Sequence, residues 1–107
     1  MDKNIVKKII DYDGKGEYLG LATIVASHGS SPREAGTQMV VYPDGSISGT
    51  VGGGPVEYET IKKARHLLEK GEDKKYEFDI SNEEVAQTGG ICGGHVEIFI
   101  ETINMKC

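Results

Sequence analysis

Three stretches of the sequence combine glycine with side chains that could bind a ligand or react with one. They are Gly29-Ser30-Ser31-Pro32-Arg33, Gly52-Gly53-Gly54 and Gly89-Gly90-Ile91-Cys92-Gly93-Gly94. Each stretch directly follows or precedes a predicted strand, so all three loops could gather at one edge of a sheet. Together they would offer hydroxyls, a guanidinium, backbone amides and a thiol.

The triple glycine lies between a predicted strand and a predicted helix. A glycine loop that enters a helix N-terminus presents backbone N–H groups and the positive end of the helix dipole, which favour an anion such as phosphate. The loop lacks the GxGxxG spacing and the lysine of nucleotide-binding motifs, so a tight strand-to-helix turn is the alternative interpretation. Glu57, in the first helical turn, favours the dipole but would repel a phosphate placed beside it.

Arg33 and the two serines before it could form a second wall of an anion site. The guanidinium is a planar fork suited to a phosphate or a carboxylate, and Ser30 and Ser31 can donate further hydrogen bonds. Without the glycine loop beside it, this segment would be an ordinary surface loop.

Cys92 is the only internal cysteine, since the other, Cys107, is the last residue. Glycines around Cys92 leave its sulfur open to close approach, whereas a structural cysteine usually sits among apolar side chains. Cys92 and His95 have C-x-x-H spacing, which is weak evidence for zinc without a second pair. His28 and His66 are interpreted as a loop residue and a solvated helix residue.

The remaining pattern predicts the elements that must position these loops. Ile5, Val6, Ile9 and Ile10 indicate a first helix, and residues 18–27 a strand buried on both faces. Residues 37–51 predict two strands around a Pro-Asp-Gly turn. A helix follows the glycines, with Tyr58, Ile61, Ala64, Leu67 and Leu68 on its apolar face and Gly71 as its stop. Strands are predicted over residues 75–80 and 95–103. The fold class is therefore α+β, a single two-layer domain over residues 1–107 with a mixed sheet of about five strands and two main helices.

Composition narrows the functional classes. The chain has 107 residues and a net charge of −5, which argues against nucleic acid or an anionic membrane as the main partner. No apolar run approaches the ~20 residues of a membrane span, and no signal-peptide pattern begins the chain. The predicted location is the cytoplasm.

The motifs taken together resemble the XdhC/CoxI family, the accessory proteins of xanthine dehydrogenase and carbon monoxide dehydrogenase. They are GSSPR, a Pro-Asp-Gly hairpin, GTVGGGPVE before a helix and CGGHVE before a strand, in that order between about Leu19 and Glu101. Two positions depart from the family pattern. Pro55 stands where members often have a cysteine, and the Rossmann-type domain of longer members is not in this chain.

The resemblance implies a binding and delivery protein for the molybdenum cofactor, molybdopterin, that supports its sulfuration and its insertion into a molybdenum hydroxylase. A cysteine desulfurase, a separate Rossmann-domain chain and a second copy of this chain are the other expected partners. Alternatives are a sulfur transferase using Cys92, with Glu57 or His95 assisting proton transfer, and an interaction subunit that has lost the cofactor site. The predicted cofactor-binding residues are Ser30, Ser31, Arg33, Gly52, Gly53, Gly54, Glu57, Cys92, Gly93 and Gly94, with Cys92 as the metal ligand and no catalytic residue.

Overall fold

The computed structural model describes residues 3–12, 18–29, 33–80 and 94–105. Within these ranges the chain forms helices and strands in the order α1 (Lys3–Asp11), β1 (Tyr18–Gly29), β2 (Gln38–Val41), β3 (Ile47–Gly49), α2 (Gly54–Lys70), β4 (Lys74–Ile80) and β5 (Gly94–Asn104).

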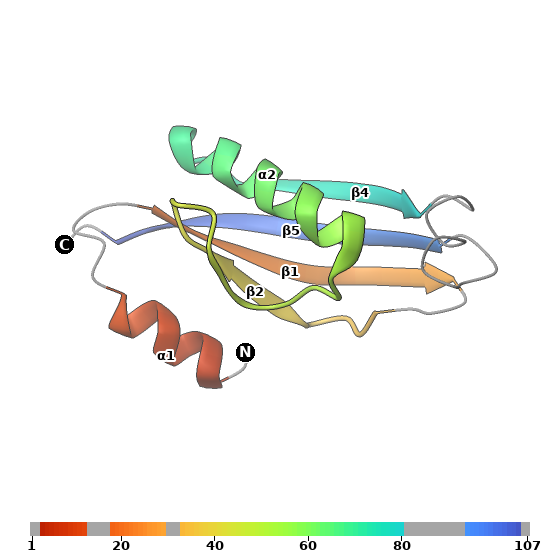
Figure 1. Cartoon of the computed structure of the whole chain (residues 1–107), viewed down its shortest axis with the longest axis horizontal. Helices are drawn as coiled ribbons and strands as arrows, with labels where there is room; N and C mark the ends of the chain where they lie inside the picture. Colours follow the sequence, from red (N-terminus) through yellow and green to blue (C-terminus); the bar gives the residue numbers. More distant parts are fainter. Residues whose placement is uncertain (1–2, 13–17, 30–32, 81–93, 106–107) are drawn as a thin grey trace.

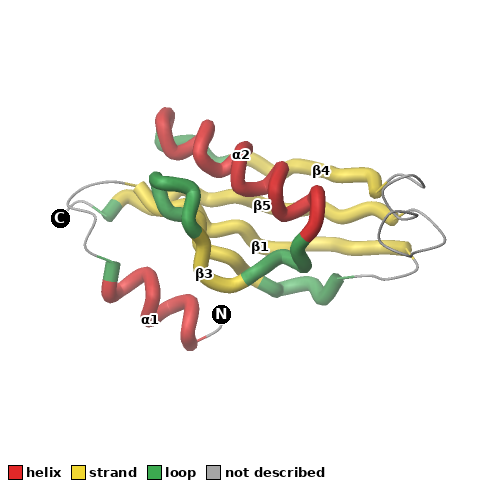
Figure 2. Tube along the Cα trace, viewed as in Figure 1, coloured by secondary structure: helices red, strands yellow, loops and turns green. Residues whose placement is uncertain are grey.

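The five strands form one sheet in the order β3-β2-β1-β5-β4. The predicted α+β class, with about five strands and two helices, is confirmed. Every pairing among these strands is antiparallel, so the sheet is not mixed as predicted. The physical reason is the crossover through α2, which connects β3 at one edge of the sheet to β4 at the other (Figure 2). These two strands would pair in parallel, but they are not neighbours.

Helix α2 covers one face of the sheet. Its buried residues Val56, Ala64 and Leu67 pack with every second residue of the central strands, including Ile24 of β1 and Ile98 of β5. Tyr58, predicted to lie on this apolar face, is instead 62% exposed. It follows Val56 by two positions, which turns its side chain roughly 200° around the helix.

Helix α1 packs against part of the opposite face (Figure 2). Its Ile5 lies with Leu19 and Leu21 of β1 and Val40 of β2. Strand β1 is therefore buried on both faces over residues 19–22, whereas Val25, inside the predicted run of 18–27, is 46% exposed. The domain has a partial third layer. Ile10 is 72% exposed rather than on the predicted apolar face, because five residues after Ile5 the helix has turned roughly 140° away.

The turns that end these elements follow the sequence signals. Gly71 takes the left-handed conformation after α2, with φ 66° and ψ 34°, and its N–H donates to the Leu67 carbonyl at 2.8 Å. In the β2–β3 hairpin, Asp44 accepts hydrogen bonds from the Ser46 N–H at 2.9 Å and from the Ser46 hydroxyl at 2.6 Å. Within the described ranges, neither helix has the length and apolar character needed to cross a bilayer.

Candidate functional site

Three strand ends meet at one end of the sheet. Gly94, the first residue of β5, lies opposite Gly29 at the end of β1 and opposite Ile80 at the end of β4. Figure 1 shows these ends side by side. The predicted site residues Ser30, Ser31, Cys92 and Gly93 lie outside the described residues. The described neighbours of these loops in the sequence, Gly29 and Gly94, lie opposite each other.

A bulge in β1 determines on which face of the sheet the last side chains of this strand lie. The register against β5 shifts between Ile24 and Ala26. Because side chains alternate along a strand, the extra residue places Ser27 on the α2 face and His28 on the opposite face. Without the bulge these two side chains would exchange faces.

Arg33 joins the first loop to the triple glycine. Its backbone N–H donates to Ser27 Oγ at 2.8 Å, which fixes the chain just after the undescribed segment. Its guanidinium reaches the glycine loop, where Nη2 donates to the Gly53 carbonyl at 3.4 Å. A Cβ added at Gly52 would lie 2.1 Å from Arg33 Nε, a distance that no side chain tolerates. Two of the three loops predicted to meet therefore do so, and Gly52 lacks a side chain where Arg33 lies.

One nitrogen of this guanidinium has no acceptor in the described part of the chain. Arg33 Nη1 is buried and makes no hydrogen bond there. Guanidinium is always charged and carries five N–H donors, so a buried nitrogen without an acceptor is unfavourable. An anion next to Arg33 would supply the missing acceptor.

Glu57 organises the glycine loop from the first turn of α2. Its Oε1 accepts hydrogen bonds from the backbone N–H groups of Val51 and Gly53, each at 3.1 Å, and from the Thr50 hydroxyl. The Gly52 N–H donates to Thr50 Oγ1 at 3.0 Å. The amides expected to cradle an external anion thus bind the domain's own carboxylate or the hydroxyl that it holds.

The other two glycines of the loop face open space. Gly53 and Gly54 have φ values of 74° and 69°, a region that residues with a Cβ avoid. A Cβ built at either position would meet nothing within 4 Å. The surface over these two residues is therefore free for a ligand to approach the backbone, whereas Gly52, with a φ of 112°, lies against Arg33.

The sheet face opposite α2 carries a charged cluster that sequence reasoning did not predict. His95 Nδ1 lies 2.7 Å from Asp79 Oδ1, and His95 Nε2 lies 3.3 Å from Glu77 Oε1 and 3.9 Å from Glu97 Oε2. The hydrogen bond to Asp79, helped by the negative charges of Asp79 and Glu77, raises the pKa of His95. The ring of His28 stacks on that of His95 with centroids 6.4 Å apart. In the sequence, the signal for this cluster was the alternation of polar residues along the two strands β4 and β5.

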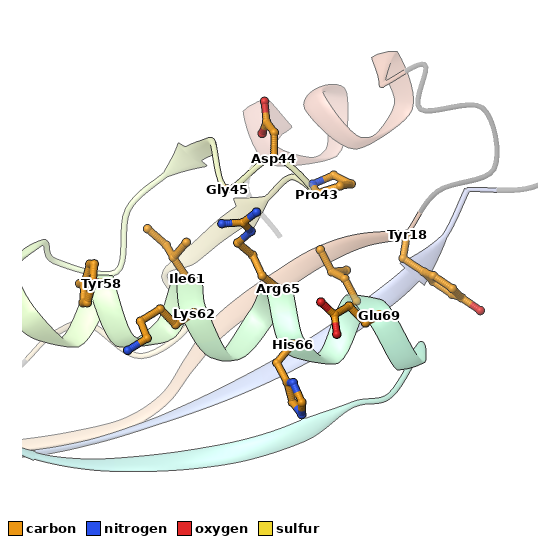
Figure 3. A pocket seen from close by; sticks show the side chains of 11 residues that line it. Tyr18, Pro43, Asp44, Gly45, Tyr58, Ile61, Lys62, Arg65, His66 and Glu69 are labelled. Carbon is orange, nitrogen blue, oxygen red and sulfur yellow. The ribbon is translucent and has the colours of Figure 1, made fainter.

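A separate hollow of about 790 Å³ lies between the outer side of α2 and the β2–β3 hairpin. Figure 3 shows Lys62, Arg65 and His66 on the helix, with Asp44 and Gly45 across from Arg65. A Cβ at Gly45 would lie 3.3 Å from Arg65 Nη1, so the turn and this side chain are in close contact. None of the predicted site residues lines the hollow.

The fold and the site define an α+β domain in which an arginine from the loop after the central strand lies against a glycine loop at a helix N-terminus. Comparison with known proteins identifies its relatives. The family model for the XdhC and CoxI family matches residues 14–79, more than half of the chain. The chain belongs to the XdhC and CoxI family, which is related to xanthine dehydrogenase accessory proteins.

Two longer proteins contain a similar region. The uncharacterized protein YqeB of Escherichia coli K12 is 36% identical over 86 residues, which cover 80% of this chain and 16% of that protein. A crystal structure from Bacillus halodurans, described as a xanthine dehydrogenase, superposes with a TM-score of 0.77 at 23% identity, covering 95% of this chain and 30% of that one. The second likeness shows the shared fold. The chain thus spans less than a third of either protein.

Proposed function

We propose that this domain binds the molybdenum cofactor and supports its sulfuration and its delivery to a molybdenum hydroxylase. The observation that carries the proposal is the buried Arg33 Nη1, which lacks an acceptor in the described chain and belongs to the guanidinium whose Nη2 donates to the Gly53 carbonyl. Molybdopterin carries a phosphate, which is the kind of acceptor that a guanidinium binds best. Membership of a family associated with the maturation of molybdenum enzymes supports the choice of ligand.

The residues present fit such a ligand. Arg33 would hold the phosphate, with Ser30 and Ser31 as further donors. Helix geometry leaves the first N–H groups of α2 without intrahelical acceptors, so the amides of Gly54 and Val56 would add to the positive end of the dipole. The missing side chains at Gly53 and Gly54 would let a flat group lie against the backbone.

Glu57 would act as a positioning residue in this arrangement. Its carboxylate already accepts hydrogen bonds from the N–H groups of Val51 and Gly53, so it holds the loop in the conformation that Arg33 contacts. A second anion bound at those same amides would be repelled by Glu57. We therefore assign phosphate recognition to Arg33 and the helix start rather than to the amides of Gly52 and Gly53.

Cys92 would complete the site as a soft ligand close to the molybdenum. When bound, the cofactor would supply the metal centre that accepts the terminal sulfur. The part of this chain is to bind, orient and shield that group, since a thiolate is the residue type that suits a soft metal or sulfur contact. A molybdenum hydroxylase, a cysteine desulfurase and a second copy of this chain are the partners that this role would need.

The test is titration of purified molybdopterin into the wild-type domain and its variants, with circular dichroism as the control for folding. Arg33→Ala should weaken binding tenfold to a hundredfold, because a hydrogen bond to a charged group contributes about 1.5–3 kcal/mol. Arg65→Ala is the matched control, since Arg65 is the only other arginine and lines the separate hollow. Binding by Arg33→Ala as tight as by wild type would refute the site.

Two further variants separate the backbone from the thiol. Gly53→Val should abolish binding, because a branched side chain would fill the open surface and strain a φ of 74°. Cys92→Ser should retain bare molybdopterin and lose the sulfurated cofactor, measured as molybdenum and labile sulfur carried through purification. Equal retention of both forms by Cys92→Ser would remove Cys92 from the mechanism.

A further inference from the structure

We propose that Glu77, His95 and Glu97 form a binding site for a divalent transition-metal ion of the zinc class. The three residues lie on strands β4 and β5, on the sheet face opposite α2. Their ligand atoms all lie within 4.8 Å of one another. Imidazole nitrogen and carboxylate oxygen are both ordinary zinc ligands in proteins.

The strand register brings these side chains together. Glu77 lies directly opposite Glu97, and Asp79 directly opposite His95, in the antiparallel pair of β4 and β5. Directly opposite residues have close Cβ atoms, and residues two apart on one strand share a face. Glu77, Glu97 and His95 therefore converge from a rigid ladder rather than from loops.

The imidazole is oriented as a metal ligand would be. His95 Nδ1 lies 2.7 Å from Asp79 Oδ1, so Nδ1 carries the proton and donates it to this carboxylate. In the neutral ring Nε2 then carries the lone pair, and it lies 3.3 Å from Glu77 Oε1 and 3.9 Å from Glu97 Oε2. Histidines that bind metals generally donate their other ring N–H to a carboxylate, which fixes the tautomer and the ring direction.

The second oxygen of Glu97 is also fixed. Its Oε1 pairs with Lys75 Nζ at 2.9 Å, which leaves Oε2 directed to the cluster. The side chains of Glu97 and His95 are only 21% and 30% exposed, so two of the three ligands are held by their surroundings. Glu77, at 59% exposed, can adjust its position.

Distances and charge both favour a cation. Ligand atoms about 2.0–2.1 Å from a tetrahedral zinc ion lie about 3.3–3.5 Å apart. The two distances to His95 Nε2 are 3.3 and 3.9 Å, and all three pairs lie within 4.8 Å, so the exposed Glu77 would have to move toward the other two ligands. The cluster contains three carboxylates, those of Glu77, Asp79 and Glu97, and one lysine, Lys75. It also contains the imidazole rings of His95 and His28. With both rings neutral, two negative charges remain for an ion to balance.

The test is isothermal titration with Zn²⁺ on the full chain after chelator treatment. Both cysteines are replaced by serine, because thiolates are stronger zinc ligands than carboxylates. We expect one ion per chain with a Kd in the micromolar range. Glu77→Gln should weaken binding at least tenfold and leave the fold unchanged, because the side chain is exposed. Glu101→Gln is the matched control, since it removes the same charge from the same face of β5.

A second measurement identifies the ligand atom. Zinc should shift the Nε2 resonance of His95 in histidine-ring NMR spectra and leave Nδ1 protonated, while His66 on α2 should not move. The site is refuted by a Kd weaker than about 1 mM, by equal losses in Glu77→Gln and Glu101→Gln, or by an unshifted His95 Nε2. It does not rest on the proposed cofactor site, because these residues occupy the opposite face of the sheet.

Discussion

The contact between Arg33 and Gly52 predicts a specific pattern of coupling between two substitutions. A Cβ at Gly52 would lie 2.1 Å from Arg33 Nε and 2.8 Å from Arg33 Cδ. Gly52→Ala must therefore displace the arginine, in addition to placing alanine at a φ of 112°. In an Arg33→Ala protein the Cβ added at Gly52 would not clash with an arginine, so the same substitution would lower the free energy of unfolding only through its strained backbone conformation.

The magnitude follows from these two contributions. Alanine in an unfavourable backbone region costs about 1–3 kcal/mol. Displacing Arg33 loses its hydrogen bond to the Gly53 carbonyl, which at 3.4 Å is long and contributes about 0.5–1 kcal/mol, together with the packing of its stem. The coupling energy between Gly52→Ala and Arg33→Ala should thus be about 1 kcal/mol, above the usual additivity error of about 0.3–0.5 kcal/mol.

Urea unfolding followed by circular dichroism measures this coupling as a double-mutant cycle. Gly54→Ala is the matched control, because its Cβ would meet nothing within 4 Å and its φ is likewise positive at 69°. Gly54→Ala should be additive with Arg33→Ala. Additive behaviour of Gly52→Ala with Arg33→Ala would show that Arg33 does not lie against the loop, and would remove the basis of the proposed anion site.

Three further outcomes are expected from the same domain. Glu57→Ala should lower the free energy of unfolding by about 2 kcal/mol in urea titrations, because two loop amides lose their acceptor, and Glu57→Gln should lower it less. Gly71→Ala should cost about 1–2 kcal/mol and lower the Tm, since its φ is 66° and its Cβ would lie 2.8 Å from the Tyr18 ring. Hydrogen bonds from Ser46 lower the pKa of Asp44, so this carboxylate stabilises the fold above its unfolded pKa. That contribution should disappear as pH falls through the folded pKa, and the acid loss of stability should be smaller in Asp44→Asn than in wild type, measured by urea unfolding at a series of pH values.

Local sequence signals predicted the elements of this fold well. The unbroken apolar run of β1 indicated burial on both faces, which the packing of Leu21 toward α1 and Ala22 toward α2 confirms for the first part of the strand but which the exposed Val25 contradicts further along. Gly71 marked the end of α2 because a left-handed residue there favours glycine. Such signals depend on residues close in sequence, and therefore survive without knowledge of the tertiary structure.

The gathering of glycine loops at one edge of the sheet was expected, but the strand order and the register that produce it were not predicted. The neighbours of β1 include β5, so Gly29 lies opposite Gly94 although most of the chain separates them. The convergence of Glu77, His95 and Glu97 depends on that sheet order and on the register of β4 against β5. The periodicity of each strand shows which residues share a face, but not which strand lies beside it or in which register.

The roles of the three loop glycines show why composition alone left their function open. Gly52 is required by Arg33, while Gly53 and Gly54 take positive φ values beneath an open surface. Glu57 holds the loop by its amides, and Arg33 contacts the carbonyl that this conformation presents. Because Arg33 and Glu57 both bind the backbone of the same glycine loop, the three form one structural unit. A ligand that bound Arg33 would therefore also stabilise the start of α2, and protection of the helix's first-turn amides from hydrogen exchange would report its binding.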